Sequence, residues 1–241
     1  QAPVPNRIPF LAVPTTAGTG SEATRFAVIY RGGEKRSVSH GSGIPGAVLL
    51  DPTALESLPD YHRKSSMLDA LCHGIESFWS LRADAESREI SRQALERLRE
   101  NWNGYIQNTP AGNAGMLEAA HLAGRAIDRT QTTAGHAMCY KLTALYRIAH
   151  GYAAGLCVRV LWPYMAERAA GTELEAVFQA LAEAFGCADT GEALGEYERL
   201  WERLGLETPE PEAGDLEILK HSVNAERLKN NPIPLDMETI D

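Results

Sequence analysis

The sequence lacks several features that would assign a protein to a class at once. No apolar run reaches the roughly 20 residues that span a bilayer, and residues 1–6 have neither the basic nor the apolar region of a signal peptide. Basic residues are scarce, since 23 Lys and Arg stand against 32 Asp and Glu and leave a net charge of −9. Nucleic acids and anionic membranes bind clustered cations. We therefore expect a cytoplasmic protein with no nucleic-acid partner and no membrane partner.

Paired cysteines are also absent. The four cysteines are Cys72, Cys139, Cys157 and Cys187, and no two of them form a CxxC motif. Such spacing is typical of reduced, buried thiols. The 241 residues, 44% of them hydrophobic and 23% charged, are enough for one large globular domain or two modest ones.

Strands are expected only near the start of the sequence. Short apolar or β-prone runs predict strands at residues 8–13, 26–30, 36–39 and 47–50. Gly32 and Gly33 predict the turn of a hairpin between the middle two strands. Because these strands are too few for a sheet with its own core, we interpret residues 1–54 as the remainder of a larger α/β domain.

From residue 55 onward the pattern becomes helical. Apolar residues recur every three or four positions over residues 61–80, 85–108, 113–129, 150–170, 173–185 and 192–204. The sequence therefore predicts a mainly α fold in two parts. An α/β remnant covers residues 1–54, and an all-helical domain covers residues 55–241.

One aspartate and three histidines are candidate metal ligands. Asp69 and His73 are four residues apart in a predicted helix and share one face of it. His136 and His150 stand among small or apolar residues, where a buried imidazole needs a partner. Each residue taken alone is also compatible with a structural hydrogen bond. Together they form a set suited to Fe(II) or Zn(II), between which ligand type does not decide.

A loop rich in threonine and glycine is a candidate anion site. Residues 14–22 read PTTAGTGSE, so backbone N–H groups and hydroxyls can face a phosphate. A helix expected after Ser21 would add its positive end. The loop matches neither a Walker motif nor GxGxxG, and a plain turn is the alternative.

These motifs resemble those of the iron-containing (group III) alcohol dehydrogenases. PTTAGTGSE is similar to the signature loop of that family, and DALCHGIES at residues 69–77 is similar to its ligand-bearing helix. His136 and His150 keep the family's separation of 14 residues. The resemblance covers nearly the whole chain. It implies a dehydroquinate synthase-like architecture, in which a Rossmann-like α/β domain precedes a helical metal-binding domain.

The resemblance also implies roles for individual residues. The implied ligands of Fe(II), or of Zn(II), are Asp69, His73, His136 and His150. The residues implied to lie along NAD(H) or NADP(H) are Thr15, Thr16, Thr19 and Lys35. The metal would act as a Lewis acid on the oxygen of a small alcohol or aldehyde, and the cofactor would transfer the hydride. A homo-oligomer is the expected assembly.

Two departures from the family pattern stand out. Nothing matches the family's GGGS pyrophosphate loop, so we expect the chain to represent the C-terminal portion of such an enzyme. Tyr140 stands where many members have a histidine beside the substrate. A phenol donates a hydrogen bond but does not shuttle protons near neutral pH as imidazole does. Tyr140 is the candidate catalytic residue.

Residues around Tyr140, and a stretch at residues 222–232, are similar to a narrower branch that includes phosphonoacetaldehyde reductases. Cations near His136 can hold a phosphonate or carboxylate group, and Arg125 and Lys141 are the candidates. The alternative is that these side chains cap helices or face solvent.

The expected function is a metal-dependent alcohol dehydrogenase or aldehyde reductase, with phosphonoacetaldehyde as one candidate substrate. Two alternatives stand beside it. One is a catalytically silent metal-binding or oligomerisation module, and the other is a non-redox, metal-dependent lyase related to dehydroquinate synthase. The motifs do not distinguish NAD from NADP, because the family's ribose-contacting residues lie upstream of them.

Overall fold

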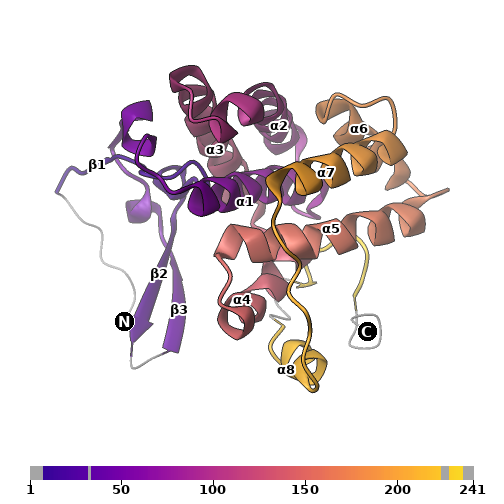
Figure 1. Ribbon diagram of the computed structural model, residues 1–241. Helices are drawn as coiled ribbons and strands as arrows, with labels where there is room; N and C mark the ends of the chain where they lie inside the picture. The colour runs from indigo at the N-terminus through magenta and orange to yellow at the C-terminus, as the bar shows by residue number, and fades with distance from the viewer. Residues whose placement is uncertain (1–7, 32–33, 224–227, 236–241) are drawn as a thin grey trace.

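The computed structural model describes residues 8–31, 34–223 and 228–235, and for residues 30–31 and 34–37 it describes the backbone alone. Figure 1 shows a helical body with the strands at one end. The helices are α1 (Asp60–Trp79), α2 (Ala85–Ile106), α3 (Pro110–Thr130), α4 (Ala134–Tyr146), α5 (His150–Ala169), α6 (Glu175–Ala184), α7 (Thr190–Leu204) and α8 (Asp215–Lys220). The strands are β1 (Leu11–Ala12), β2 (Phe26–Arg31), β3 (Glu34–Ser39) and β4 (Ala47–Val48). The expectation of a mainly α fold is confirmed.

The strands form two separate pairs. β1 lies parallel to β4, with Leu11 opposite Ala47, and β2 pairs antiparallel with β3, with Phe26 opposite Ser39. The expected hairpin is therefore present, and its turn at residues 32–33 lies outside the described residues. Both strand pairs lie at the same end of the helical body (Figure 1).

The prediction of a helix after Ser21 is wrong. That stretch forms a single 3₁₀ turn, Ser21–Ala23, and Thr24 is already extended. A turn of three residues has no aligned peptide dipoles to sum. The threonine- and glycine-rich loop therefore gains no positive helix end from the residues that follow it.

Helix α1 lies at the centre of the helical body (Figure 1). It packs against α2, α3, α5 and α6. Apolar residues such as Leu71 and Ile75, which have no solvent exposure, alternate with polar ones that are also buried, among them Asp69 and Glu76. Buried polar groups need partners, so the polar side chains of α1 draw other elements of the chain toward them.

Arg63 fixes the start of α1. Its buried guanidinium donates hydrogen bonds to the carbonyl oxygens of Leu55 and Tyr105, at 2.5 and 3.1 Å. It also donates to the side-chain oxygens of Asn108 and Asn113, both at 2.7 Å. Arg63 thereby ties α1 to the α2–α3 connection and to the 3₁₀ turn before α1. The domain boundary expected between residues 54 and 55 falls within this 3₁₀ turn, Pro52–Leu55. It stays a prediction.

Polar caps explain several helix boundaries. Asp84 and Ser87 form a reciprocal capping box at the start of α2, Thr109 caps α3 ahead of Pro110, and Asp189 caps α7. The expected positions of these helices are confirmed to within a few residues. Helices α4 and α8 were not expected, because α4 is small or apolar at most positions and shows little periodicity, and α8 has only 6 residues.

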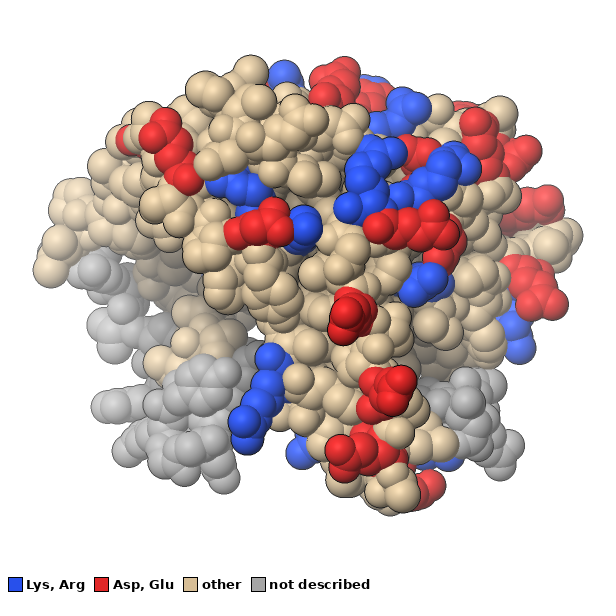
Figure 2. Space-filling view, in the orientation of Figure 1, with Lys and Arg blue, Asp and Glu red and all other residues tan. Residues whose placement is uncertain are grey.

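Acidic and basic side chains are intermixed over the helices on the face shown in Figure 2. No continuous basic track crosses that face. Among the described residues, none of the helices combines the length and the apolar character that crossing a membrane requires.

Candidate metal centre

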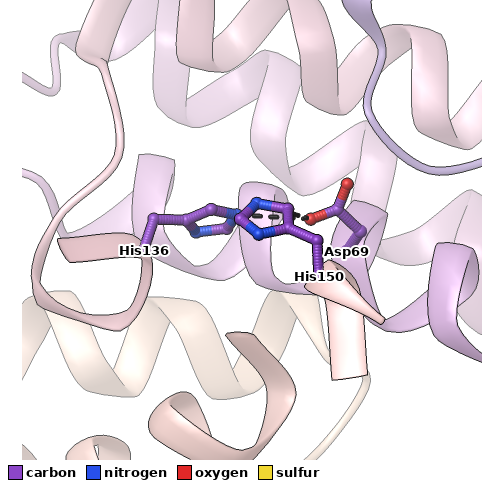
Figure 3. A group of neighbouring side chains, drawn as sticks. All are labelled: Asp69, His136 and His150. Carbon is purple, nitrogen blue, oxygen red and sulfur yellow. Dashed lines mark hydrogen bonds and ion pairs between the residues drawn. The ribbon is translucent and has the colours of Figure 1, made fainter. Parts of the chain in front are cut away.

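Three side chains from three helices point toward one another in Figure 3. Asp69 comes from the middle of α1, His136 from the first turn of α4, and His150 from the first residue of α5. Asp69 and His136 are buried, whereas the side chain of His150 keeps 36% of its exposure. One ligand atom from each residue lies within 4.8 Å of the other two. We call these three residues the Asp–His–His group.

The distances to one carboxylate oxygen show that the group suits a metal ion. Asp69 Oδ1 lies 3.3 Å from His136 Nε2 and 3.9 Å from His150 Nε2. Such atoms bind zinc at about 2.1 Å, so two atoms that share an ion are at most about 4.2 Å apart. Both distances to Asp69 meet this limit, and the ligand nitrogens of the two histidines lie within 4.8 Å of each other. One carboxylate and two imidazoles suit a divalent ion of borderline softness, either Fe(II) or Zn(II).

His73 lies beside the Asp–His–His group without being aligned with it. Its Nε2 is 3.9 Å from Asp69 Oδ1, as their spacing along α1 predicts. Its ring is stacked on that of His136, with centroids 4.6 Å apart and planes 17° from parallel. Imidazole binds a metal through a lone pair in the ring plane, so stacked rings do not aim at one point. The role of His73 as a fourth ligand stays a prediction that requires its ring to turn.

Glu76 fixes the orientation of His136. It has no solvent exposure, and its Oε1 accepts hydrogen bonds from Thr133 N, Thr133 Oγ1 and His136 N, at 2.9, 2.7 and 3.2 Å. Its Oε2 accepts a hydrogen bond from His136 Nδ1. Because a carboxylate only accepts, Nδ1 must carry a proton. This leaves His136 Nε2, which faces Asp69, as the nitrogen able to exchange a proton for a metal ion.

Glycine 151 brings the start of α5 against α1. A Cβ added at Gly151 would lie 2.1 Å from the carbonyl oxygen of Ser65 and 2.6 Å from Cβ of Asp69. No larger residue allows this approach. The backbone N–H of Ala149 donates to Tyr61 Oη at 2.8 Å and fixes the entry to the helix. Together these contacts place the histidine that begins α5 beside Asp69.

Cys139 contacts the second nitrogen of His150. The buried thiol lies 3.6 Å from His150 Nδ1 and donates to the carbonyl oxygen of His136, also at 3.6 Å. With its proton on that carbonyl, the sulfur can accept a hydrogen bond from Nδ1 of His150. Both histidines of the Asp–His–His group therefore have Nδ1 in contact with a buried partner and Nε2 near Asp69. Such outer contacts commonly orient metal ligands.

Burial and charge oppose each other on the titratable groups. Burial raises the pKa of Asp69, but the surrounding histidines outweigh it and hold that pKa well below its ordinary value. Burial lowers the pKa of His136, but Glu76 and Asp69 outweigh it and raise it to about 9. Burial lowers the pKa of His73 to about 4, against the opposing charge of Asp69. Without a metal, the site therefore holds a carboxylate beside an imidazolium at neutral pH.

Tyr140 covers one side of His150. Their rings are stacked, with centroids 5.2 Å apart and planes 26° from parallel. Lys141 follows Tyr140 on α4 and is half-buried. Within the part of the chain that the structure describes, Lys141 takes part in no ion pair. Both candidates thus lie on the helix that carries His136.

The threonine- and glycine-rich loop meets α1 close to the Asp–His–His group. A Cβ added at Gly18 would lie 2.8 Å from Cβ of Ser66, which precedes Asp69 by about one helical turn. The backbone of Gly18 also acts on the pKa of His73, which it raises against the effect of burial. The loop and the candidate metal ligands therefore share one segment of α1.

The threonines of this loop differ in exposure. Thr15 and Thr19 are exposed, and Thr16 is half-buried. Thr19 Oγ1 accepts a hydrogen bond from the backbone N–H of Ser21 at 3.2 Å. Their place along a dinucleotide stays a prediction, and so does that of Lys35, whose side chain lies outside the described residues.

Arg125 is not brought to the Asp–His–His group. It is exposed on α3 and lines a surface hollow together with Arg25, His121 and Arg129. None of the residues that line this hollow belongs to the candidate metal centre. Arg125 is close to His136 in sequence but lines this separate hollow, and its role in holding a substrate anion stays a prediction.

Glu76 and Cys139 were missed by reasoning from the sequence. Glu76 follows Asp69 by seven residues, or about two helical turns, so the two share a face of α1. This spacing of seven residues was the sequence feature from which the position of Glu76 beside the site could have been predicted. Cys139 follows His136 by three residues, and nothing in the sequence distinguishes it from any small buried residue.

Comparisons with known proteins identify the family of the chain. The profile described as Fe-containing alcohol dehydrogenase family, C-terminal, matches residues 64–240, and that described as Iron-containing alcohol dehydrogenase matches residues 1–52. Phosphonoacetaldehyde reductase of Streptomyces viridochromogenes is 34% identical over 251 residues, which cover 98% of this chain and 63% of the reductase. The probable alcohol dehydrogenase EutG of Escherichia coli is 33% identical over 152 residues, covering 61% of this chain and 38% of EutG.

Solved structures have the same fold. Sulfoacetaldehyde reductase of Bifidobacterium kashiwanohense, in complex with NAD+, matches with a TM-score of 0.89 and 25% identity over 100% of this chain and 65% of that one. The iron-containing alcohol dehydrogenase of Thermotoga maritima matches with a TM-score of 0.83 and 28% identity over 97% of this chain and 62% of that one. The chain thus spans less than two thirds of each of these relatives. Since the two profile matches cover most of its residues, the chain belongs to the iron-containing alcohol dehydrogenase family.

Proposed function

We propose that this chain is the metal-binding portion of a nicotinamide-dependent alcohol dehydrogenase or aldehyde reductase. The observation that carries the proposal is the convergence of Asp69, His136 and His150 from three helices. A bound Fe(II) or Zn(II) would polarise the oxygen of an alcohol or aldehyde. Membership of an iron-containing family favours Fe(II).

The residues of the centre have separate tasks. Asp69 supplies a negative charge, because its pKa is held low. His136 and His150 supply Nε2 as donor atoms, and Glu76 keeps the proton of His136 on Nδ1. His73 adds a fourth donor when its ring turns out of the stack with His136.

The threonine- and glycine-rich loop, residues 14–22, supports a nicotinamide cofactor next to this centre. Hydride transfer requires the donor and acceptor carbons to be in contact, so the cofactor must lie beside the substrate. The loop meets α1 at Ser66, about one turn from Asp69. The hydroxyls that we assign to contacts with NAD(H) or NADP(H) are those of Thr15, Thr16 and Thr19.

The substrate that we propose is a small aldehyde with an anionic group. Two relatives are named for phosphonoacetaldehyde and for sulfoacetaldehyde, and both names describe an acetaldehyde with an acidic substituent. Lys141 is half-buried on the helix that bears His136 and has no ion pair among the described side chains, so it is available to pair with such a group. Tyr140 beside it can donate a hydrogen bond to the substrate.

Metal analysis of the purified protein tests the centre. We expect about one divalent ion per chain, bound by the Asp–His–His group. Asp69→Ala and His150→Ala each remove a ligand and should weaken metal binding by more than the roughly 10–100-fold typical of outer contacts. His221→Ala is the matched control, because His221 is exposed at the end of α8. Unchanged metal affinity in both ligand variants would contradict the proposal.

Oxidation of NADH and NADPH by the metal-loaded protein tests the substrate. Acetaldehyde, phosphonoacetaldehyde and sulfoacetaldehyde are compared for the wild type, Lys141→Met and Arg125→Met. A lost charge-assisted hydrogen bond should raise KM for the two anionic aldehydes about tenfold or more in Lys141→Met. The KM for acetaldehyde should stay the same, and Arg125→Met should behave as wild type. Equal effects of Lys141→Met on all three aldehydes would exclude an anion site at this residue.

A further inference from the structure

The described C-terminal segment, residues 228–235, packs on the helical body far from its neighbours in sequence. Asn230 and Asn231 in this segment are 4% and 3% exposed. The carbonyl oxygen of Asn230 accepts a hydrogen bond from the backbone N–H of Leu81 at 3.1 Å. The segment therefore reaches the end of α1, about 150 residues earlier in the chain.

Both polar atoms of the Asn230 side chain have hydrogen-bond partners. Its Oδ1 accepts a hydrogen bond from Ser80 Oγ at 2.9 Å. Its Nδ2 donates to the carbonyl oxygens of Thr130 and Thr132, at 2.9 and 3.1 Å. An asparagine amide has two N–H donors and a carbonyl acceptor, and each of them has a protein partner here. Such a satisfied buried amide fixes the backbone that it touches.

The two carbonyl groups held by Asn230 flank a backbone conformation that non-glycine residues avoid. Gln131 lies between them, with φ 59° and ψ 171°. This region is sparsely populated except by glycine and persists only where surrounding contacts hold it. The connection between α3 and α4 therefore owes its shape to contacts from outside itself, and Asn230 supplies two of them.

That connection leads directly to the candidate metal centre. Thr133, the next residue after Thr132, donates from its backbone N–H and its hydroxyl to Glu76 Oε1. The same carboxylate accepts from N and from Nδ1 of His136. A connection of another shape would move Thr133 away from Glu76 and would free the carboxylate that orients His136.

We propose that Asn230 is a positioning residue of the metal centre, which shapes the α3–α4 connection so that Thr133 and Glu76 hold His136 in its ligand orientation. The inference rests on the metal centre proposed above. It gives the C-terminal segment a task at a site whose ligands all lie before residue 151. Asn230 itself does not touch the Asp–His–His group.

Asn230→Asp and Asn230→Ala test this role. Asn230→Asp keeps the shape but places a carboxylate oxygen against two carbonyl groups, and Asn230→Ala removes all three contacts. We expect metal affinity, measured by competition with a chelator on folded protein, to fall about tenfold or more, as outer contacts of a ligand do. Backbone amide exchange at Thr133 and His136 should accelerate, because their N–H groups would lose Glu76.

Asn231→Ala is the matched control. Asn231 is equally buried, but its Nδ2 donates to the Ile233 carbonyl oxygen at 2.7 Å and contacts Met165 Sδ at 3.2 Å, away from the α3–α4 connection. This variant should lower the melting temperature and leave metal affinity and exchange at Thr133 unchanged. If all three variants lower affinity alike, or if the Asn230 variants lose only thermal stability, the positioning role is wrong. If the wild-type protein binds no ion, the proposed function fails instead.

Discussion

Glu76 has no exposed surface and accepts four hydrogen bonds from two residues. Glu76→Gln keeps its shape and can keep Oε1 as an acceptor, but it turns an N–H group toward His136 Nδ1. His136 must then give up the Nδ1 proton and carry it on Nε2, where it blocks the metal. We expect metal affinity to fall roughly 10–100-fold, measured by chelator competition. Glu96→Gln, at an exposed ion pair with Arg92, should leave the affinity unchanged, and equal affinity in both variants would show that Glu76 does not set the tautomer.

The raised pKa of His136 gives metal binding a pH dependence. In the metal-free protein, burial lowers this pKa, but Glu76 and Asp69 outweigh it and raise it from 6.5 to about 9. Below pH 9 the metal must displace a proton from His136, so the apparent affinity should rise with pH and level off above 9. By the same linkage, the stability that this imidazolium adds to the metal-free fold is complete below pH 6.5 and is lost between pH 6.5 and 9. Metal titrations across this range check the first trend and thermal unfolding the second, and an affinity that stays constant from pH 6.5 to 9 would refute the first.

The candidate ligand residues could be predicted from the sequence more readily than their orientation. Helical spacing places Asp69 and His73 on one face, and the apolar surroundings of His136 and His150 mark them as partnered histidines. The spacing of residues along the sequence does not determine how a side-chain ring is rotated, so the stacking of His73 on His136 could not be predicted. It depends on how closely α4 approaches α1, which packing decides.

At the scale of elements, α5 can approach α1 closely because Gly151 has no side chain. Gly151→Ala would place Cβ 2.1 Å from the Ser65 carbonyl oxygen and 2.6 Å from Cβ of Asp69, so α5 must move away. We expect a loss of about 1–3 kcal/mol in the free energy of unfolding, as in other overpacked cores, together with weaker metal binding. Gly41→Ala, where an added Cβ meets nothing within 4 Å, is the control. Denaturant unfolding and metal titration of both variants test this prediction. Wild-type stability and metal affinity in Gly151→Ala would show that the contact between α1 and α5 tolerates an added methyl group.

The helices with one apolar face, a cap and a stop signal could be predicted from the sequence. Asp84, Thr109 and Asp189 mark helix starts that the structure contains. Helix α4 escaped because most of its residues are small or apolar, and a helix apolar on most faces has no distinctive period. The helix expected after Ser21 is a single 3₁₀ turn, Ser21–Ala23, because the extended strand that begins at Phe26 leaves too few residues for a longer helix.

At the scale of the whole molecule, the parallel strand pair is the surface that stands out. Parallel strands in globular proteins are normally covered on both faces, but Leu11 of β1 is 56% exposed and Leu49, after β4, is 50% exposed. Figure 2 shows few charged side chains at the left edge, where Figure 1 places β1. Contiguous exposed apolar surface promotes association.

We therefore expect the 241-residue chain to associate as its concentration rises, in sedimentation velocity experiments. Leu11→Lys should shift the distribution toward monomer, because it places a charge on this surface. Val160→Lys, at a residue on α5 that is 70% exposed, is the control and should leave association unchanged. If Val160→Lys disperses the protein and Leu11→Lys does not, association proceeds through α5 instead.

The expectation of two parts, a β remnant and a helical domain, could be formed from composition and periodicity alone. The contacts that tie distant segments together could not. Arg63 with Tyr105, and Asn230 with Thr130, join residues that are far apart in the chain and share no sequence pattern. Such pairs arise from the tertiary packing that periodicity does not encode.

The distance between Asn230 and the ligands in the chain bears on how the protein matures. Synthesis proceeds from the N-terminus, so every ligand residue has been made before the amide that shapes the α3–α4 connection exists. A nascent chain can form its helices early, yet its His136 gains the final geometry only after Asn230 has been synthesised. A metal ion should therefore bind tightly only after Asn230 has left the ribosome and packed against the α3–α4 connection.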